Sequence, residues 1–370
     1  MSPPTKLHLP TPLLPPSSLI LVTGANGLIA SHAADQLLAA GYRVRGTVRS
    51  ATRCAYLTTL FDARHGPGRF SLHEIPDVTA PGGVWEGAVA GVSAIAHVLG
   101  AVDLAVRDAD AAAAAELPWQ VGLLEAAARE GGVKAVAFTS SAWAVWTPDA
   151  GKRVRLTGGS WNEEAVALAR DKAVAPERKG FAGFMAFKTL IEKGVWEWVR
   201  REKPAFAFNT VLLDTVLGEC LDPENQGIPS TAGMAQWVWE NIHVDTLNMM
   251  QPQWFADCRD AGRLYVALLA TAPLVDRERI FGFGARYSFF RVAEILKELY
   301  PEHADKMAKV KDLGWDQTEV PNERGAELLA RLGQEGGWRT LEESVKENAE
   351  SWLKLKPARV TDEKYVQIGK

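Results

Sequence analysis

The sequence predicts an α/β fold in which a doubly wound parallel sheet is followed by a smaller carboxyl-terminal substrate lobe. The first indication is a regular alternation of short apolar runs with amphipathic stretches from Leu19 onward. The second is a glycine-containing turn, residues 24–27, between the first apolar run and the first amphipathic stretch. The third is size, because 370 residues, 47% of them hydrophobic, suffice for one large α/β domain and a second lobe.

The expected elements follow from these runs in chain order. The strands are Leu19–Thr23, Arg43–Val48, Phe70–Ile75, Ala94–Val98, Ala135–Thr139 and Ala205–Leu213. The helices between them include Leu28–Ala40, Thr52–Ala63 and Ala111–Glu130. Pro118 interrupts the last of these, so we expect that helix to begin again near Trp119. Beyond Leu217 the alternation fades, leaving helices at Gly262–Ala272, Phe289–Tyr300 and Leu341–Leu355 and a short strand at Arg279–Phe283.

The chain is therefore expected to divide into four parts. Residues 1–18 contain six prolines and are predicted to be a disordered, polyproline-like leader. Residues 19–215 form the dinucleotide-binding domain, and 216–356 form a lobe over the strand ends, where α/β sheets bind ligands. Residues 357–370 are a tail.

Composition excludes several classes of function. The net charge of −4 gives no basic surface for nucleic acid. No apolar run approaches the roughly 20 residues of a membrane span, and the leader lacks the pattern of a targeting segment. The three cysteines and seven histidines are scattered, so neither a disulfide framework nor a metal site is expected. We expect a cytoplasmic protein, a monomer or homodimer, whose partner is a small-molecule substrate.

The turn after the first strand is predicted to hold the phosphates of a dinucleotide. Gly24 permits a tight turn, Gly27 lets the backbone approach the pyrophosphate, and Ala30 keeps the helix close to the strand. The contacts expected from this segment come from Gly24, Asn26, Gly27, Leu28 and Ile29. An incidental glycine turn is the alternative, but the strand before it and the helix after it favour the cofactor site.

The end of the second strand indicates which cofactor. A site for NAD(H) places Asp or Glu here to bind the ribose 2′-hydroxyl, and none is present. Arg49 and Ser50 occupy the position, with Arg53 one turn later, and a guanidinium pairs well with a 2′-phosphate. The sequence therefore favours NADP(H), with solvent-exposed arginines as the alternative interpretation.

Three later strand ends supply further candidates for cofactor binding. Asp77 and Val78 follow the third strand, where a carboxylate can accept from the adenine amino group or form an ordinary turn. Val98 and Thr139 end the fourth and fifth strands. His97 points either into the sheet as a structural histidine or into the site.

Together these residues resemble the extended short-chain dehydrogenases/reductases, in particular fungal carbonyl (aldehyde) reductases and plant dihydroflavonol reductases. The similarity runs from Leu19 to about Leu355 and includes Val44–Ser50, Val133–Ser141, Asp222–Glu224, Trp254–Asp260 and Gly337–Ser344. It implies dependence on NADPH. It also implies that Ser141 holds the substrate carbonyl and that Lys188 binds the nicotinamide ribose.

The departures from that family lie in the chemistry. The catalytic tyrosine of the family falls on Phe184, and a helix asparagine that organises a proton relay falls on Gly122. A small residue of the same helix falls on Trp119, and a Pro-Asn pair beside the nicotinamide falls on Leu213-Asp214. An acid at a strand end, Asp214 either performs acid/base work in place of the tyrosine or caps a turn.

The leading prediction is therefore an NADP(H)-dependent oxidoreductase for a bulky aromatic or polycyclic carbonyl, enone or imine-like substrate, in fungal secondary metabolism. Its catalytic residues are Ser141, Lys188 and Asp214, and its substrate pocket includes Trp143, Phe184 and Trp237, unless these aromatic residues are ordinary core. A non-redox isomerase, lyase or cyclase that keeps the cofactor is the first alternative. A non-catalytic NADPH-binding protein is the second.

Overall fold

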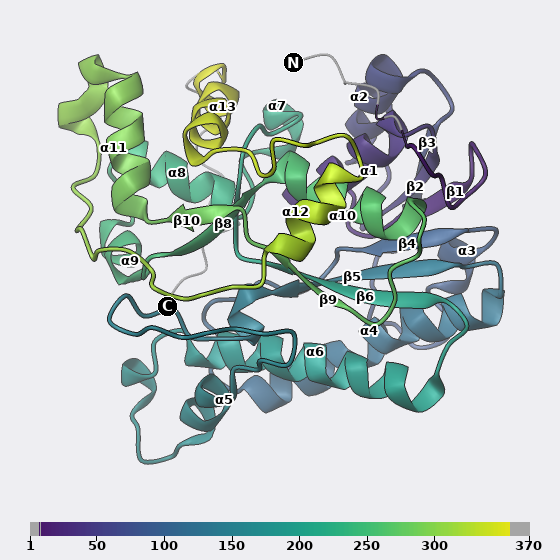
Figure 1. Ribbon diagram of the computed structural model, residues 1–370, viewed down its shortest axis with the longest axis horizontal. Coiled ribbons are helices and arrows are strands. Elements are labelled where there is room, and N and C mark those ends of the chain that lie inside the picture. The colour runs from purple at the N-terminus through teal and green to yellow at the C-terminus, as the bar shows by residue number, and fades with distance from the viewer. Residues whose placement is uncertain (1–6, 8, 356–370) are drawn as a thin grey trace.

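A parallel sheet of seven strands forms the centre of the computed structural model, which describes residues 7 and 9–355 (Figure 1). The strand order is β3-β2-β1-β4-β5-β6-β9, and each neighbouring pair is parallel. The strands are β1 (Leu19–Val22), β2 (Arg43–Val48), β3 (Phe70–Glu74), β4 (Ala94–His97), β5 (Ala135–Ser141), β6 (Ala207–Leu213) and β9 (Arg279–Gly282). The order reverses between β1 and β4, which confirms the doubly wound α/β fold.

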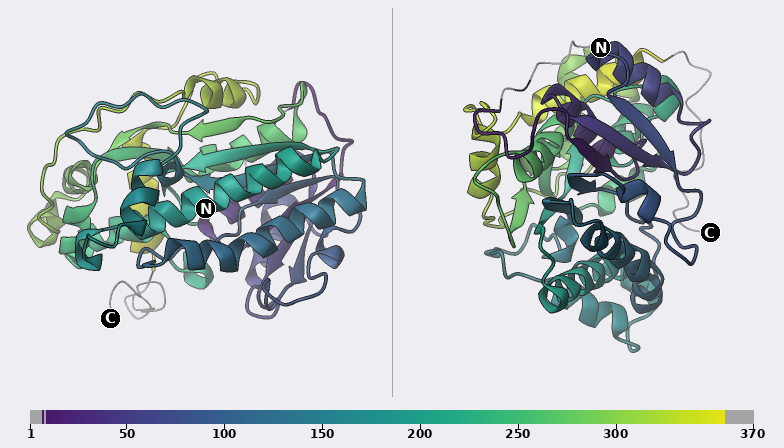
Figure 2. Two further views of the ribbon diagram at one scale, coloured as in Figure 1. Left: turned by 90° about the horizontal axis from the view of Figure 1, so that it is seen from below. Right: turned by 90° about the vertical axis from the view of Figure 1, so that its right-hand side faces the viewer.

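Helices cover both faces of this sheet and create two hydrophobic cores (Figures 1 and 2). One face carries α1 (Leu28–Ala39), α10 (Cys258–Ala270) and α12 (Glu323–Ala330). The other carries α4 (Ala109–Glu130), α5 (Glu163–Arg170) and α6 (Ala182–Glu202), with the short α3 (Glu86–Val89) beside α4. The helix α2 (Tyr56–His65) follows β2. None of the helices within residues 7 and 9–355 is long and apolar enough to cross a membrane.

A second sheet of three strands, in the order β10-β8-β7, lies beside the carboxyl end of the main sheet (Figure 1). Its strands are β7 (Thr215–Leu217), β8 (Gln253–Asp257) and β10 (Ala285–Tyr287). The helices of this region are α7 (Pro223–Gln226), α8 (Thr231–Glu240), α9 (Val244–Met249), α11 (Phe289–Leu299) and α13 (Leu341–Leu353). Short 3₁₀ turns lie at Ala142–Ala144, Pro176–Arg178 and Pro301–Lys306.

The expected division at residue 215 differs from the structure, because the later part of the chain returns to the first domain. Its helix α10 packs along α1, and its strand β9 completes the main sheet. A parallel strand needs a crossover connection, and α10 provides it. The approach is close: a Cβ on Gly262 would lie 2.7 Å from the backbone oxygen of His32. The segments after residue 215 therefore belong partly to the dinucleotide-binding domain.

The break expected near Trp119 is absent, because α4 runs through Pro118 without interruption. A proline removes one backbone donor and normally kinks a helix. Here α4 packs tightly against α6, and a Cβ on Gly194 would lie 2.5 Å from the Leu117 side chain. Tertiary packing on both sides of the proline therefore outweighs the lost hydrogen bond.

The prediction of a disordered leader is wrong for residues 9–18. The amide of Leu13 donates to the Ala270 oxygen at 2.8 Å, and Leu14 is 4% exposed among residues of the α1–α10 core. The amide of Ala272 donates to the Thr11 oxygen, so this segment is anchored at the end of α10. The predicted tail, 357–370, lies outside the described residues.

Candidate active site and cofactor site

The glycine turn is held in a shape that suits a bound phosphate. Gly24 has φ +67°, and its amide donates to Thr47 Oγ1 at 3.1 Å. The helix α1 begins behind Gly27 with no side chain capping its first amides, so they are available to an anion. Gln226 of α7 donates to the Asn26 oxygen at 3.0 Å and steadies the loop from the second lobe. The residues present therefore fit the pyrophosphate of a dinucleotide.

The Thr23 hydroxyl joins the carboxyl ends of β1 and β4. Its oxygen accepts from the amides of Val98 and Leu99 at 2.9 and 3.0 Å and lies 2.8 Å from His97 Nδ1. Because that oxygen already accepts twice, its own proton faces Nδ1, and the imidazole proton lies on Nε2. Burial lowers the pKa of His97 to about 3, opposed by its interaction with Gln120. His97 is therefore a neutral structural residue.

Arg49 and Arg53 lie close together at the end of β2, both exposed. Burial raises the pKa of the Cys54 thiol, and the two guanidinium groups oppose that shift, which places all three in one neighbourhood. Ser50 is half-buried beside them. Sequence reasoning missed Glu74, which ends β3 and accepts from the amide that follows Ser50 at 2.6 Å. This carboxylate fixes the loop that presents the two arginines.

Two residues predicted to contact the cofactor have side chains that form hydrogen bonds within the protein. Asp77 is exposed and accepts from the amide and the hydroxyl of Thr79, and these hydrogen bonds lower its pKa. It therefore forms a turn, with Val78 half-buried behind it. The Thr139 hydroxyl lies 2.6 Å from the Tyr265 hydroxyl of α10. The Thr139 hydroxyl therefore has a partner within the fold, and its contact with the cofactor stays a prediction.

Ser141 and Phe184 meet through Trp143. The Ser141 hydroxyl accepts from the Trp143 amide at 3.2 Å, and the Trp143 ring stands edge-on to Phe184 with centroids 5.8 Å apart. Phe181 adds a second ring 5.5 Å from Trp143, and Gln253 of β8 accepts from its indole nitrogen at 2.6 Å. Phe184, which is 6% exposed, supplies no hydroxyl here.

Lys188 lies one helical turn beyond Phe184 and points toward the end of β4. Its Nζ donates to the Ala101 oxygen at 2.6 Å and lies 5.4 Å from the Phe184 ring centroid. The buried side chains of α4 in this neighbourhood are Glu116 and Gln120, which sequence reasoning missed. The sequence feature that could have identified them is a pair of polar residues four positions apart on an alanine-rich helix.

The predicted relay position on α4 lies elsewhere. A Cβ on Gly122 would meet the Trp85 side chain at 3.7 Å rather than Lys188. The Trp119 oxygen accepts from the Trp85 indole at 3.0 Å, so the turn of α4 at residues 119–122 faces the packing interior. Gly122 therefore packs beside Trp85, and the part that Trp119 and Gly122 play in a proton relay stays a prediction.

Asp214 lies where β6 ends, beside the end of β5 that carries Ser141. Strand register pairs Ser141 with Leu213, so the following residue leaves the sheet at the same edge. The Asp214 carboxylate accepts from the Trp254 amide at 3.0 Å. Burial raises the pKa of Asp214 well above its usual value, and Asp316 raises it further. No ion pair to Asp214 occurs in the described part of the chain, so a proton on this group is favoured.

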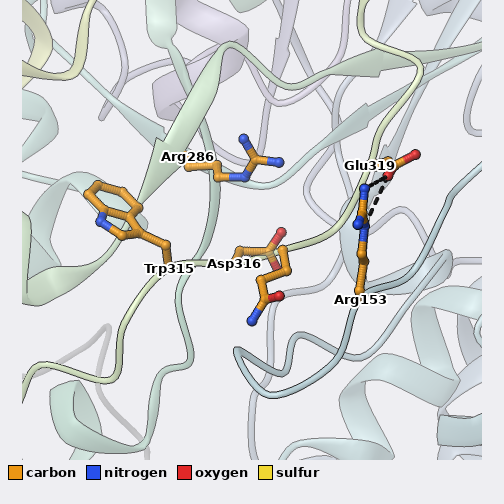
Figure 3. A pocket seen from close by; sticks show the side chains of 6 residues that line it. Arg153, Arg286, Trp315, Asp316 and Glu319 are labelled. Carbon is orange, nitrogen blue, oxygen red and sulfur yellow. Dashed lines mark hydrogen bonds and ion pairs between the residues drawn. The ribbon is translucent and has the colours of Figure 1, made fainter.

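A cavity of about 500 Å³ opens beside Asp316 (Figure 3). Its lining comes from Arg153, Arg286, Trp315, Asp316, Gln317 and Glu319. Asp316 accepts from the Trp254 indole at 3.1 Å, and the Arg286 guanidinium lies 4.7 Å from the centre of the Trp254 ring. Trp254 thus connects this cavity to Asp214. Trp237, predicted for the pocket, packs its ring against His243 with centroids 4.7 Å apart, and its place in the pocket stays a prediction.

The fold and the glycine turn define a dinucleotide-binding α/β protein, and similarity to known proteins narrows the class. A model described as the NAD dependent epimerase/dehydratase family matches residues 20–155. Aldehyde reductase 2 of Sporidiobolus salmonicolor is 32% identical over 336 residues, 90% of this chain and 96% of that protein. Ketoreductase adrE of Penicillium rubens is 34% identical over the same coverage. The chain therefore belongs to the NAD dependent epimerase/dehydratase family, the extended short-chain dehydrogenases/reductases.

The fold agrees with solved reductases. Gre2 from Candida albicans, crystallised in complex with NADPH, superposes with a TM-score of 0.74 and 21% identity. The match covers 91% of this chain and 98% of that chain. At this level of identity the likeness establishes the fold.

The raised pKa of Asp214 predicts a gain in stability on its neutralisation. Burial favours the protonated carboxyl in the folded state, so ionisation costs stability as the pH rises above the unfolded pKa of about 4. Asp214→Asn keeps an oxygen for the Trp254 amide and should raise the melting temperature at pH 8. The gain should vanish near pH 4. Thermal unfolding across this range measures it, and an equal shift at both pH values would contradict a buried, protonation-dependent Asp214.

Proposed function

We propose that the protein is an NADP(H)-dependent reductase of a bulky aromatic or polycyclic substrate. One observation carries this proposal: the segment at the end of β4 is contacted by the cofactor turn on one side and by Lys188 on the other. A Cβ on Gly24 would lie 3.2 Å from Leu99, and Lys188 donates to Ala101. A dinucleotide that crosses the sheet at this point would extend from the arginines of β2 toward Ser141.

Each site residue has a part in this reaction. The uncapped amides of α1 would hold the pyrophosphate, and Arg49 and Arg53 the 2′-phosphate. Lys188 would bind the nicotinamide ribose, and the bound nicotinamide supplies hydride. Ser141 would donate a hydrogen bond to the substrate oxygen. Asp214, kept protonated by burial, would supply the proton that Phe184 cannot.

The aromatic surroundings support a large, flat substrate. Trp143, Phe181 and Phe184 pack around the reacting position, and aromatic rings offset against one another favour planar ligands. A carbonyl, an enone or an imine-like acceptor fits this description, and an iminium carbon accepts hydride with no proton transfer to oxygen. The fungal aldehyde and ketoreductases among the relatives support a role in fungal secondary metabolism.

The missing tyrosine hydroxyl favours a second candidate function, a non-redox isomerase, lyase or cyclase that retains the cofactor as part of its cavity. A third is an NADPH-binding protein without turnover. Incubation with NADPH and candidate substrates separates the three. With a reductase, the absorbance of reduced nicotinamide falls as product forms. With a non-redox enzyme, substrate is converted while this absorbance stays constant. With a protein that only binds NADPH, neither the absorbance nor the substrate changes.

The arginines at the end of β2 predict a preference for NADPH over NADH. Arg49→Glu should abolish or reverse it, because a carboxylate repels the 2′-phosphate and can accept from a 2′-hydroxyl. Dissociation constants for both cofactors measure the change, and Arg200→Glu on the exposed end of α6 is the control. Equal affinities in the parent protein would contradict the assignment.

Replacing Phe184 by tyrosine tests whether the lost hydroxyl is a defect or an adaptation. In a degraded carbonyl reductase, Phe184→Tyr should raise the reduction of simple aromatic ketones by up to about 10²–10⁴-fold, the value of a positioned general acid. In a site rebuilt around another acid, it should leave the native reaction no faster. Steady-state kinetics on both substrate types distinguish these outcomes.

Asp214→Asn should lower kcat by about 10²-fold or more while the affinity for NADPH stays nearly constant, because the amide cannot donate the required proton. Asp305→Asn, an exposed substitution on the second lobe, is the matched control. Unchanged turnover in Asp214→Asn would transfer the role to Ser141 and a substrate that manages its own proton.

A further inference from the structure

Lys188 occupies an environment that disfavours its charge. Its Nζ has the Phe184 and Phe187 ring centroids at 5.4 and 5.1 Å and one hydrogen bond, to the Ala101 oxygen. Burial lowers the pKa of this lysine, and the field of Glu116 raises it in opposition. Neither ring has a hydroxyl that could pair with the ammonium, so its charge needs support from another element.

Glu116 of α4 is placed to give that support. A Cβ on Gly100 would lie 3.5 Å from Glu116 Oε1 and 3.6 Å from Lys188 Nζ, so both groups converge on the same glycine. Glu116 is 5% exposed, and its Oε2 accepts from the Ala101 amide at 3.1 Å. The two groups thus hold opposite sides of one peptide segment, and Glu116 is the charged side chain that opposes the burial of Lys188.

The carboxylate is fixed by a chain of buried polar groups. Gln120 donates to Glu116 Oε1 at 2.7 Å and reaches toward the Leu99 oxygen at 3.4 Å. Gln120 also interacts with His97, whose other nitrogen meets the Thr23 hydroxyl. Glu116 therefore cannot turn to solvent without breaking its hydrogen bonds to the Ala101 amide and the Gln120 side chain.

We propose that Glu116 is a positioning residue that holds Lys188 as an ammonium at the β4–α4 loop, ready for the ribose hydroxyls of NADP(H). The inference rests on the proposed function and names a residue that the chain uses in place of a tyrosine partner. The faces of Phe184 and Phe187 attract the ammonium weakly, and the Glu116 carboxylate adds a full negative charge that these rings lack. Gly100 is small enough for the two groups to approach.

Glu116→Gln tests the proposal through binding rather than turnover. The dissociation constant of NADPH is measured by tryptophan fluorescence between pH 6 and 10. As the pH increases, this constant should begin to rise earlier in the variant than in the parent, because Lys188 loses its charge at a lower pH. A nearby opposite charge moves a pKa by about one unit or more, so the gap should reach about tenfold at alkaline pH. At pH 6 Lys188 is charged in both the variant and the parent, so their dissociation constants for NADPH should agree.

Two further variants keep the result interpretable. Glu125→Gln, on the exposed face of α4, should match the parent at every pH. In a Lys188→Arg background the guanidinium stays charged, so adding Glu116→Gln should produce no pH-dependent gap. If Glu116→Gln does not fold, Glu116→Asp keeps the charge and should keep the parental pH midpoint.

Reactivity without cofactor completes the test. Peptide mass spectrometry measures how fast an amine-acylating reagent labels Lys188. As the pH increases, labelling should accelerate at a lower pH in Glu116→Gln than in the parent. Identical labelling and binding profiles in the two proteins would overturn the inference. Absence of NADPH binding by the parent would instead overturn the proposed function, while the labelling profile would still report on Glu116.

Discussion

The Thr23 hydroxyl is the interaction on which the site depends. It joins β1 to β4 where the strand order reverses, by accepting from Val98 and Leu99 and meeting His97. Without it two backbone donors of the half-buried residues Val98 and Leu99 would lose their partner. The crevice that receives the cofactor is therefore set by a side chain that need not touch it.

Two carboxyl groups near Phe184 have opposite surroundings. Glu116 accepts two N–H donors and faces a lysine, whereas Asp214 accepts from the Trp254 amide and is near another acid, Asp316. Glu116 has hydrogen-bond donors around it, whereas burial raises the pKa of Asp214 and favours its proton. Titratable groups separated in this way can serve as charge support and as acid within one site.

The sequence predicted the sheet well because its signals are local. The span of β2 was predicted to the residue, since each run carries its own apolar pattern and turn. Glu116 and Pro118 could not be understood locally. The environment of Glu116 forms only when α4 packs beside the end of β4. The helix continues through Pro118 only because packing against α6 outweighs a lost hydrogen bond. Residues 9–18 gained order in the same way, from contacts with a helix some 250 positions later.

The loss of one hydroxyl changes what the rest of the site must do. A tyrosine beside Lys188 would share the lysine charge and deliver a proton, so one residue would perform both tasks. With Phe184 in that place the proposed site separates the tasks: Glu116 of α4 would support the charge, and Asp214 at the end of β6 would supply the proton. Restoring the hydroxyl by Phe184→Tyr would then add a second group that competes with Glu116 for Lys188. The rate of reduction should therefore increase less on Phe184→Tyr in a rebuilt site than in a damaged one, so this substitution distinguishes the two.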